Sequence, residues 1–335
     1  MSDIFTLLEP ARRAVAAAVA VTRAVQADLA AVRRITKDDK SPVTVADFAA
    51  QAVVALRLGA TLGHFDLIGE ESSAALRAPD AAPLLEAVTN AVRTAERGAS
   101  AAEVLAAIDR GAHDASAEAY WTLDPVDGTK GFLRGGQYAI SLAYIARGEV
   151  VLGVLGCPNM SRDFARPFDA PDPHGCLVHA VAGGGAWCVP ADDPGATPWR
   201  LQAASGRPLA ELSVCESVEA GHSRHDETAR LLDCLGARGI PARLDSQCKY
   251  AVVARGQADA YLRLPTSKSY VEKIWDHAAG ALIAAEAGAI VTDVRGLPLD
   301  FGRGATLSAN AGIICAGAEY HGALLDAARR LGLGD

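Results

Sequence analysis

Apolar positions in the first third of the chain recur at helical spacing, interrupted by short extended runs. Residues 5–34 carry apolar side chains every three or four positions with abundant alanine, which predicts one long helix. The same spacing predicts helices over 46–62 and 82–109, whereas the β-branched run 43–45 and the apolar run 65–68 are typical of extended chain. This part of the chain is therefore predicted to be mainly helical.

The pattern changes to strands after residue 120. Apolar runs predict strands over 121–124, 138–145, 150–155 and 186–189, and an Arg-Gly pair between the second and third is a hairpin signal. Pro and Asp are frequent over 158–176, which predicts an irregular excursion.

From about residue 211 the strand and helix patterns alternate. Helices are predicted at 225–236, 247–255 and 276–287, and strands at 259–264 and 289–292. This alternation is typical of an α/β arrangement.

The change of pattern also divides the chain. A boundary near 157–175 gives an N-terminal α+β domain over 1–160 and a C-terminal α/β domain over 161–335. Two domains agree with the length of 335 residues, since a domain usually takes about 100–200. Half of the residues are apolar, which excludes disorder as a global description.

Charge and cysteine content narrow the possible partners. The formal charge is −8, from 32 Lys+Arg and 40 Asp+Glu, which argues against binding of nucleic acid polymers or anionic membranes. The seven cysteines show no CxxC pair, and the start of the chain shows no signal sequence. We therefore expect a cytoplasmic protein in a reducing compartment, with neither a nucleic acid nor a membrane as partner.

Two carboxylates lie on one turn in the segment WTLDPVDGTKGF. Pro125 favours an extended Asp124, and Gly128 permits a tight turn and close ligand approach after Asp127. Two acids there can converge on one point, which is costly beside apolar strands unless a cation is present. Backbone amides from Gly128 onward can also face an anion if a helix begins there.

Three further acids have ordinary explanations when each is taken alone. Glu70 follows a short strand and a glycine, where a solvated loop acid is common. Asp47 and Asp276 open predicted helices, where a carboxylate is a good N-cap. Position alone leaves both the structural and the functional use of these acids open.

Three motifs occur together and in order: GEES, DPVDGTKGFLRG and WDHAAGALIAAEAGAIVTD. With them the chain resembles the lithium-sensitive, magnesium-dependent phosphatase superfamily that includes inositol monophosphatase and fructose-1,6-bisphosphatase. Within it the chain most resembles the 3′(2′),5′-bisphosphate nucleotidases, because it reads DGTKGF instead of DGTxNF and carries CESVEAGHSRHDE, LDSQCKY and ADAYLRLPTSKSYVEKIWDHAAG. The resemblance implies a layered αβαβα sandwich of the inositol monophosphatase and sugar phosphatase type, with the site between two halves.

The resemblance also implies metal ligands. Glu70, Asp124 and the Val126 carbonyl would hold one Mg²⁺, and Asp124, Asp127 and Asp276 a second. A hard cation such as Mg²⁺ prefers these oxygen donors, and two such ions can stabilise both the attacking and the leaving oxygen of a phosphate ester. A third, weaker Mg²⁺ is left open.

Further roles follow from the same resemblance. Asp47 and Thr129 would activate the attacking water, and the amides of Gly128 and Thr129, with Lys130, would contact phosphate. Four residues would contact the nucleoside or its second phosphate: His222, Ser246, Lys249 and Arg263. The neighbouring His225 is an alternative to His222. The alternative for Lys130 is a solvated loop position, for Lys249 a surface helix position and for Arg263 a strand-edge position.

The implied activity is Mg²⁺-dependent hydrolysis of the 3′-phosphate of adenosine 3′,5′-bisphosphate by an activated water, giving AMP and phosphate. The sulfated analogue 3′-phosphoadenosine 5′-phosphosulfate is a second implied substrate, and a monomer is the expected form. One alternative is an inositol monophosphate or sugar bisphosphate phosphatase with the same metals. The other is a non-catalytic nucleotide-binding sensor, which the presence of all five acids and Thr129 disfavours.

Overall fold

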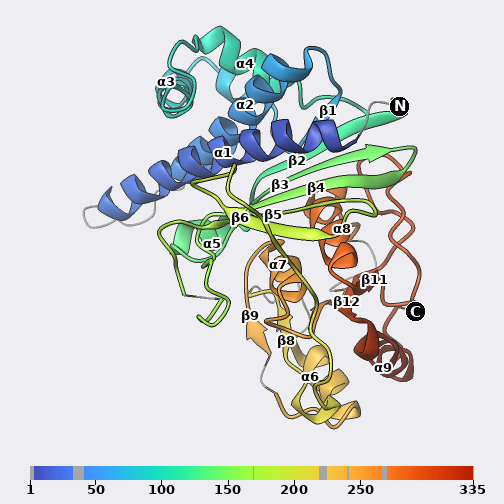
Figure 1. Ribbon diagram of the computed structural model, residues 1–335. Coiled ribbons are helices and arrows are strands. Elements are labelled where there is room, and N and C mark those ends of the chain that lie inside the picture. Colours follow the sequence, from blue (N-terminus) through green and yellow to red (C-terminus); the bar gives the residue numbers. More distant parts are fainter. Residues whose placement is uncertain are drawn as a thin grey trace.

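Five layers of helices and sheets make up the protein (Figure 1). The computed structural model describes residues 4–32, 41–168, 170–218, 225–239, 241–265 and 270–334. Its α-helices are α1 (Phe5–Val32), α2 (Ser41–Leu62), α3 (Ala82–Arg93), α4 (Ala101–Asp109), α5 (Thr129–Arg134), α6 (His225–Cys234), α7 (Cys248–Ala254), α8 (Ala278–Glu286) and α9 (Ala318–Arg330). Short 3₁₀ helices are η1 (Ser73–Arg77), η2 (Leu209–Glu211) and η3 (Ile274–Asp276).

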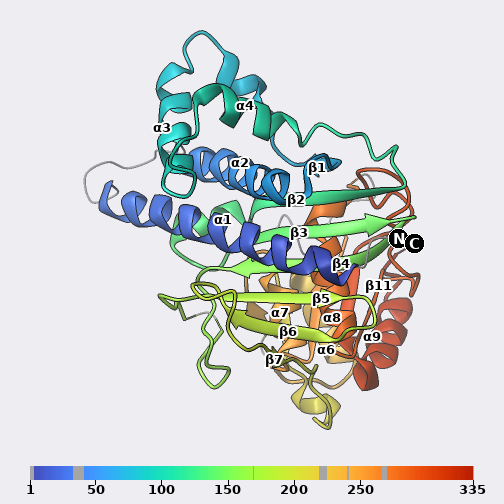
Figure 2. The ribbon, with the colours of Figure 1, turned by 45° about the horizontal axis from the view of Figure 1, so that its top comes forward.

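The first sheet has seven strands in sequential order: β1 (Leu67–Gly69), β2 (Ala119–Asp127), β3 (Ala139–Ala146), β4 (Glu149–Cys157), β5 (Cys176–Val181), β6 (Ala186–Pro190) and β7 (Trp199–Arg200). Only β1 and β2 pair in parallel; the remaining neighbours are antiparallel. Helices α1 and α2 cover one face, and α7 and α8 pack against the other (Figure 2).

The second sheet has the order β11-β12-β10-β8-β9, with β8 (Val214–Glu216), β9 (Ala242–Arg243), β10 (Ala260–Arg263), β11 (Ala289–Thr292) and β12 (Ile313–Gly317). Its inner face packs on α7 and α8, and α9 covers its outer face. The helix α8 is apolar around its whole circumference because it lies between two sheets. The predicted αβαβα sandwich is thereby confirmed.

Several predicted elements differ from those observed. Residues 43–45 belong to α2 instead of an extended run, and β2 continues to Asp127 through the Asp-Pro pair. The single helix predicted over 82–109 is two helices, because the chain turns at 94–100 and restarts at a capping box. In that box Ser100 Oγ accepts the Glu103 amide at 3.3 Å, and the Glu103 carboxylate accepts the Ser100 amide at 2.8 Å.

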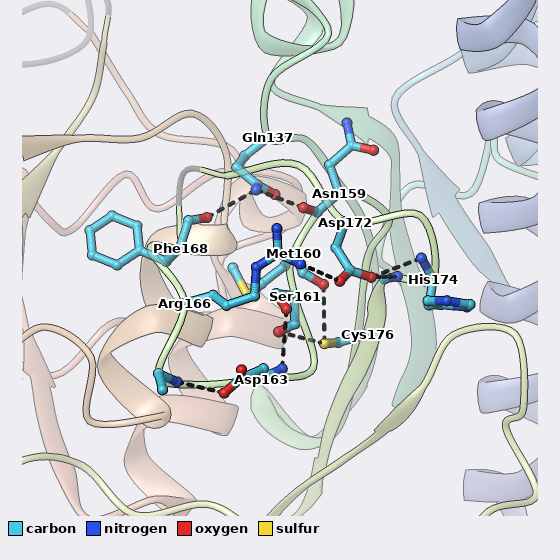
Figure 3. A network of polar contacts seen from close by, with 12 residues as sticks. Gln137, Asn159, Met160, Ser161, Asp163, Arg166, Phe168, Asp172, His174 and Cys176 are labelled. Atoms are coloured by element: carbon cyan, nitrogen blue, oxygen red, sulfur yellow. Dashed lines mark hydrogen bonds and ion pairs between the residues drawn. The ribbon is translucent and has the colours of Figure 1, made fainter.

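Residues 158–168 and 170–175 are irregular as predicted, whereas Cys176 already begins β5, and side chains hold this segment in place (Figure 3). Gln137 donates from Nε2 to the carbonyls of Asn159 and Phe168, each at 2.9 Å. The carboxylate of Asp172 accepts two backbone amides of the following turn at 2.8 and 3.1 Å. Polar side chains therefore replace a regular ladder in this segment.

The helix α2 is long and apolar enough to cross a membrane by length and composition alone. Most of its Thr44–Leu62 span is buried, and it packs against α1, α3, α4 and β2. This packing inside the protein accounts for its apolar composition. The seven cysteines, all within the described ranges, are free.

The two sheets comprise residues 67–200 and 214–317. The division into domains at residue 160 stays a prediction.

Two helical glycines allow a matched test of the central layer. A Cβ on Gly280 would lie 2.3 Å from the buried Tyr250 ring, whereas one on Gly322 would meet nothing within 4 Å. We expect Gly280→Ala to lower the free energy of unfolding by about 1–3 kcal/mol through overpacking. Gly322→Ala should raise it by about 0.5–1 kcal/mol because alanine favours the helix. Urea unfolding of both variants measures this, and equal effects would contradict the packing between α7 and α8.

Candidate active site

A cleft of about 440 Å³ opens between the two halves of the fold. It is lined by residues that follow β1 and end β2, by the start of α5, and by residues around β8, α7, β10 and η3. These are Glu70, Asp124, Val126, Asp127, Gly128, Thr129, Lys130, Leu133, Ser217, Asp245, Ser246, Gln247, Lys249, Tyr261, Arg263, Tyr270 and Asp276.

An irregularity at the end of β2 shapes one side of the cleft. Asp124 pairs with Ser141 and Asp127 with Ala139, so two residues of β2 lie opposite one of β3. Such a bulge takes backbone groups out of the ladder and re-aims side chains. The Asp124 carboxylate also accepts the Val126 amide at 3.1 Å, which fixes the turn. Val126 therefore lies at the cleft with a backbone freed from regular pairing.

Gly128 forms the junction between the two halves. Its φ of +88° favours glycine, and a Cβ there would lie 2.9 Å from the Cβ of Ser246. The backbone amide of Gln247 donates to the Asp127 carboxylate at 2.6 Å, and Arg134 pairs with Asp245 at 2.6 Å. Contacts between α5 and the segment before α7 thus set the width of the cleft.

The cleft concentrates negative charge in a buried place. Burial raises the pKa of Asp124 well above its ordinary value, and Glu70, Asp127, Asp276 and Asp47 raise it further. Burial likewise raises the pKa of Asp276 and of Glu70, with Asp127 as a further cause in both cases. This cluster disfavours its own ionised form and is therefore suited to a bound cation.

Asp47 lies in α2 beside this cluster and is not among the residues that line the cleft. Burial raises its pKa well above the ordinary value, with Glu71 and then Glu70 as further causes. One turn later, Gln51 accepts the Glu71 amide at 3.1 Å and donates to the Glu71 carbonyl at 2.7 Å. The helix α2 therefore carries both Asp47 and the side chain that fixes the Glu70-Glu71 pair.

The donor chemistry fits a hard divalent cation. The acids at the cleft and the Val126 carbonyl offer oxygen atoms, which Mg²⁺ prefers. Asp276 also belongs to a group in which it, Glu272 and His277 place ligand atoms within 4.8 Å of one another. Glu272 and His277 bond to each other at 3.1 Å, which leaves Asp276 as the member of that group facing the cleft.

Two cations complete the site. Lys249 is 3% exposed, so it is no solvated helix lysine; its Nζ donates to the carbonyls of Leu244 and Ser246 at 3.1 and 2.7 Å. Burial lowers its pKa, while the charge of Asp127 acts in the opposite direction. Arg263 reaches the cleft from β10 and pairs with Glu272.

The structure thus brings together most of the residues singled out from the sequence. Eleven of them line one cleft: Glu70, Asp124, Val126, Asp127, Gly128, Thr129, Lys130, Ser246, Lys249, Arg263 and Asp276. His222 lies outside the described residues. The ring of His225 is bonded through Nε2 to the carbonyl of Ser217 at 2.9 Å. Asp276 belongs to η3, and the N-cap of α8 is His277, so the N-cap explanation for Asp276 is wrong.

Sequence reasoning missed Gln247, whose side chain is buried at the base of the cleft. Its Nε2 donates to the Trp275 carbonyl at 2.8 Å, and its Oε1 accepts the Gly280 amide at 3.0 Å. It therefore joins the segment holding Asp127 to the one holding Asp276. Gln247 is the N-cap residue of α7 and stands between Ser246 and Lys249, so no local pattern in the sequence distinguishes it.

A layered fold whose cleft gathers carboxylates and cations is typical of metal-dependent phosphatases. Residues 6–332 match the inositol monophosphatase family. The chain belongs to this family, and the family is metal-dependent.

Relatives and solved structures agree with this assignment. The chain is 42% identical over 291 residues to the 3′(2′),5′-bisphosphate nucleotidase of Schizosaccharomyces pombe, covering 84% of this chain and 82% of the relative. It is 39% identical over 345 residues to the enzyme of that name from Oryza sativa, covering 96% and 92%. Mycobacterium tuberculosis SuhB has a similar fold, with a TM-score of 0.62, 22% identity and full coverage of both chains. CysQ from Bacteroides thetaiotaomicron, a bacterial member of the family, has a TM-score of 0.57 at 22% identity, covering 92% and 96%.

Asp124→Asn tests the charged cluster. The variant keeps an acceptor for the Val126 amide but removes one buried charge. In EDTA we expect the free energy of unfolding to rise, because the amide cannot carry the charge that burial and the neighbouring acids disfavour at Asp124. Turnover in Mg²⁺ should fall by at least about 100-fold, since even partners of metal ligands cost up to that much. Near-normal turnover would contradict the metal role of Asp124.

The raised pKa values predict a pH dependence of stability. For Asp47, Asp124 and Asp276 the folded pKa exceeds the unfolded one, and for Glu71 it is about 7. Stability from these groups is present at low pH and is lost as the pH rises through the folded pKa values. We therefore expect Tm in EDTA to fall between about pH 5 and pH 8, and less so in Mg²⁺. Identical pH profiles with and without Mg²⁺ would contradict this.

Proposed function

We propose that the protein hydrolyses the 3′-phosphate of adenosine 3′,5′-bisphosphate to AMP and phosphate, and that 3′-phosphoadenosine 5′-phosphosulfate is a second substrate. The observation that carries this proposal is a cleft that combines a carboxylate cluster with the cations Lys249 and Arg263. A bisphosphate offers one anionic group to a metal and another to the cations. The names of the relatives from Schizosaccharomyces pombe and Oryza sativa support the same substrate class.

The proposed metal ligands are grouped around the bulge at the end of β2. Glu70, Asp124 and the Val126 carbonyl would hold one Mg²⁺, and Asp124, Asp127 and Asp276 another, with a third ion left open. When bound, Mg²⁺ lowers the pKa of water and offsets the charge of the phosphate.

Asp47 and Thr129 are proposed to take the proton of the attacking water. Thr129 Oγ1 would accept this proton and pass its own to the Asp47 carboxylate. Burial beside Glu70 and Glu71 raises the pKa of Asp47, which suits a group that must take up a proton. The amides of Gly128 and Thr129, with Lys130, would orient the phosphate at the start of α5.

The second phosphate and the nucleoside are assigned to the other half. Lys249 and Arg263 would contact the phosphate, and Ser246 would lie beside the nucleoside, together with His222. We propose a cytoplasmic monomer as the working form.

A substrate panel separates this proposal from its rivals. We expect kcat/KM for adenosine 3′,5′-bisphosphate to exceed that for inositol 1-phosphate and fructose 1,6-bisphosphate by at least about 100-fold, because inositol 1-phosphate lacks the second phosphate and neither compound carries the nucleoside assigned to the second half. Phosphate release is measured in Mg²⁺, with an EDTA control. A preference for inositol or sugar phosphates would replace the proposed nucleotide substrate by a substrate of that class. Calorimetric binding of the nucleotide without phosphate release would indicate a sensor.

A further inference from the structure

Arg263 does not face the cleft as a free cation. Its Nε donates to Glu272 Oε1 at 2.8 Å, and its Nη2 pairs with Glu272 Oε2 at 2.7 Å. The same Nη2 donates to the Tyr270 hydroxyl at 3.3 Å. The two parallel bonds occupy one edge of the guanidinium and fix its plane.

Glu272 is itself held by His277, which does not line the cleft. His277 bonds through Nε2 to Glu272 Oε2 at 3.1 Å, and its Nδ1 bonds to the Tyr250 hydroxyl at 2.9 Å. A Tyr250 hydroxyl that donates to Nδ1 leaves the Nε2 proton for the carboxylate. Tyr250 packs edge-on against Tyr261 with ring centroids 4.9 Å apart. The support is therefore rigid and reaches into the central helical layer.

The whole chain of partners behind Arg263 is buried. Glu272 is 6% exposed, and His277 and Tyr250 are fully buried. Burial alone would raise the pKa of Glu272, yet the hydrogen bond to His277 and the charge of Arg263 lower it to about 2. The carboxylate therefore stays ionised and keeps Arg263 in place at any working pH.

This arrangement gives Arg263 and Lys249 different tasks in binding an anion. The ion pair of Arg263 and Glu272 is neutral as a unit, so Arg263 attracts an anion through hydrogen bonds that are already oriented, while Lys249 carries the net positive charge. Glu272 does not line the cleft, so its influence on a ligand passes through Arg263.

We propose that Glu272 is a positioning residue that sets the selectivity for substrates with a second phosphate by fixing the guanidinium of Arg263. This inference rests on the proposed nucleotidase function. It assigns to Glu272 a partner other than a metal, because both of its oxygens already bind Arg263 or His277.

The test compares two nucleotides that differ by one phosphate. Glu272→Gln keeps the shape but removes the charge. We expect KM for adenosine 3′,5′-bisphosphate to rise about tenfold, a change of about 1.4 kcal/mol, with kcat within about twofold. KM for adenosine 3′-monophosphate, which lacks the second phosphate, should stay unchanged. In an Arg263→Ala background, Glu272→Gln should add no further effect.

Controls separate positioning from general damage. Asp259→Asn makes the same chemical change in another ion pair whose carboxylate is buried, with Arg207 at 2.9 Å, and should leave both KM values unchanged. Far-ultraviolet circular dichroism checks folding, and Glu272→Asp replaces the glutamine variant if that one fails to fold. Equal KM increases for both nucleotides, additive effects with Arg263→Ala, or no change would each overturn the proposal.

The proposed function can fail separately. If the wild-type protein does not hydrolyse the bisphosphate, the same variants are compared by calorimetric binding of the two nucleotides. A selective loss of bisphosphate affinity in Glu272→Gln then supports the positioning role without the reaction. Failure of the wild-type protein to prefer the bisphosphate in binding overturns it.

Discussion

The constraint on which this structure depends is the repulsion among buried carboxylates. Glu70, Asp124, Asp127 and Asp276 share one cleft where burial disfavours the charge that each would carry in water. A fold tolerates such a cluster only if the surrounding backbone holds the acids together and a cation offsets them. The bulge in β2 and the neighbouring turn of α5 meet the first condition. Metal dependence of the family corresponds to the second.

The cleft is a product of both halves. Asp276 comes from η3, whereas the other acids of the cluster follow or end strands of the first sheet. Gln247 links the acids of the two halves, because its backbone amide donates to Asp127 and its side chain bonds to the backbone before and after Asp276. The close contact of Gly128 with Ser246 brings the cations of the second half to the same opening. The residues that form the site are therefore brought together by the same contacts that pack the two halves.

Much of the fold follows from local patterns, and the site only in part. Helical spacing predicts α1 and α6 because each buries one continuous face, but it cannot show the turn at 94–100, which depends on a capping box. The acids of the cleft stand in motifs and could be singled out, although their assigned roles stay predictions. Gln247 and Glu272 were missed, because their partners lie on other elements and no local spacing reveals them.

The order of strands in the second sheet has a consequence for synthesis of the chain. β12 follows β11 in the sequence, yet it lies between β11 and β10. During translation the sheet that supports the Asp276 half of the cleft cannot close before Gly317 has left the ribosome. The first sheet, complete by Arg200, can form earlier. Asp276 thus joins the other acids of the cluster at a late stage, when nearly the whole fold is present to offset their repulsion.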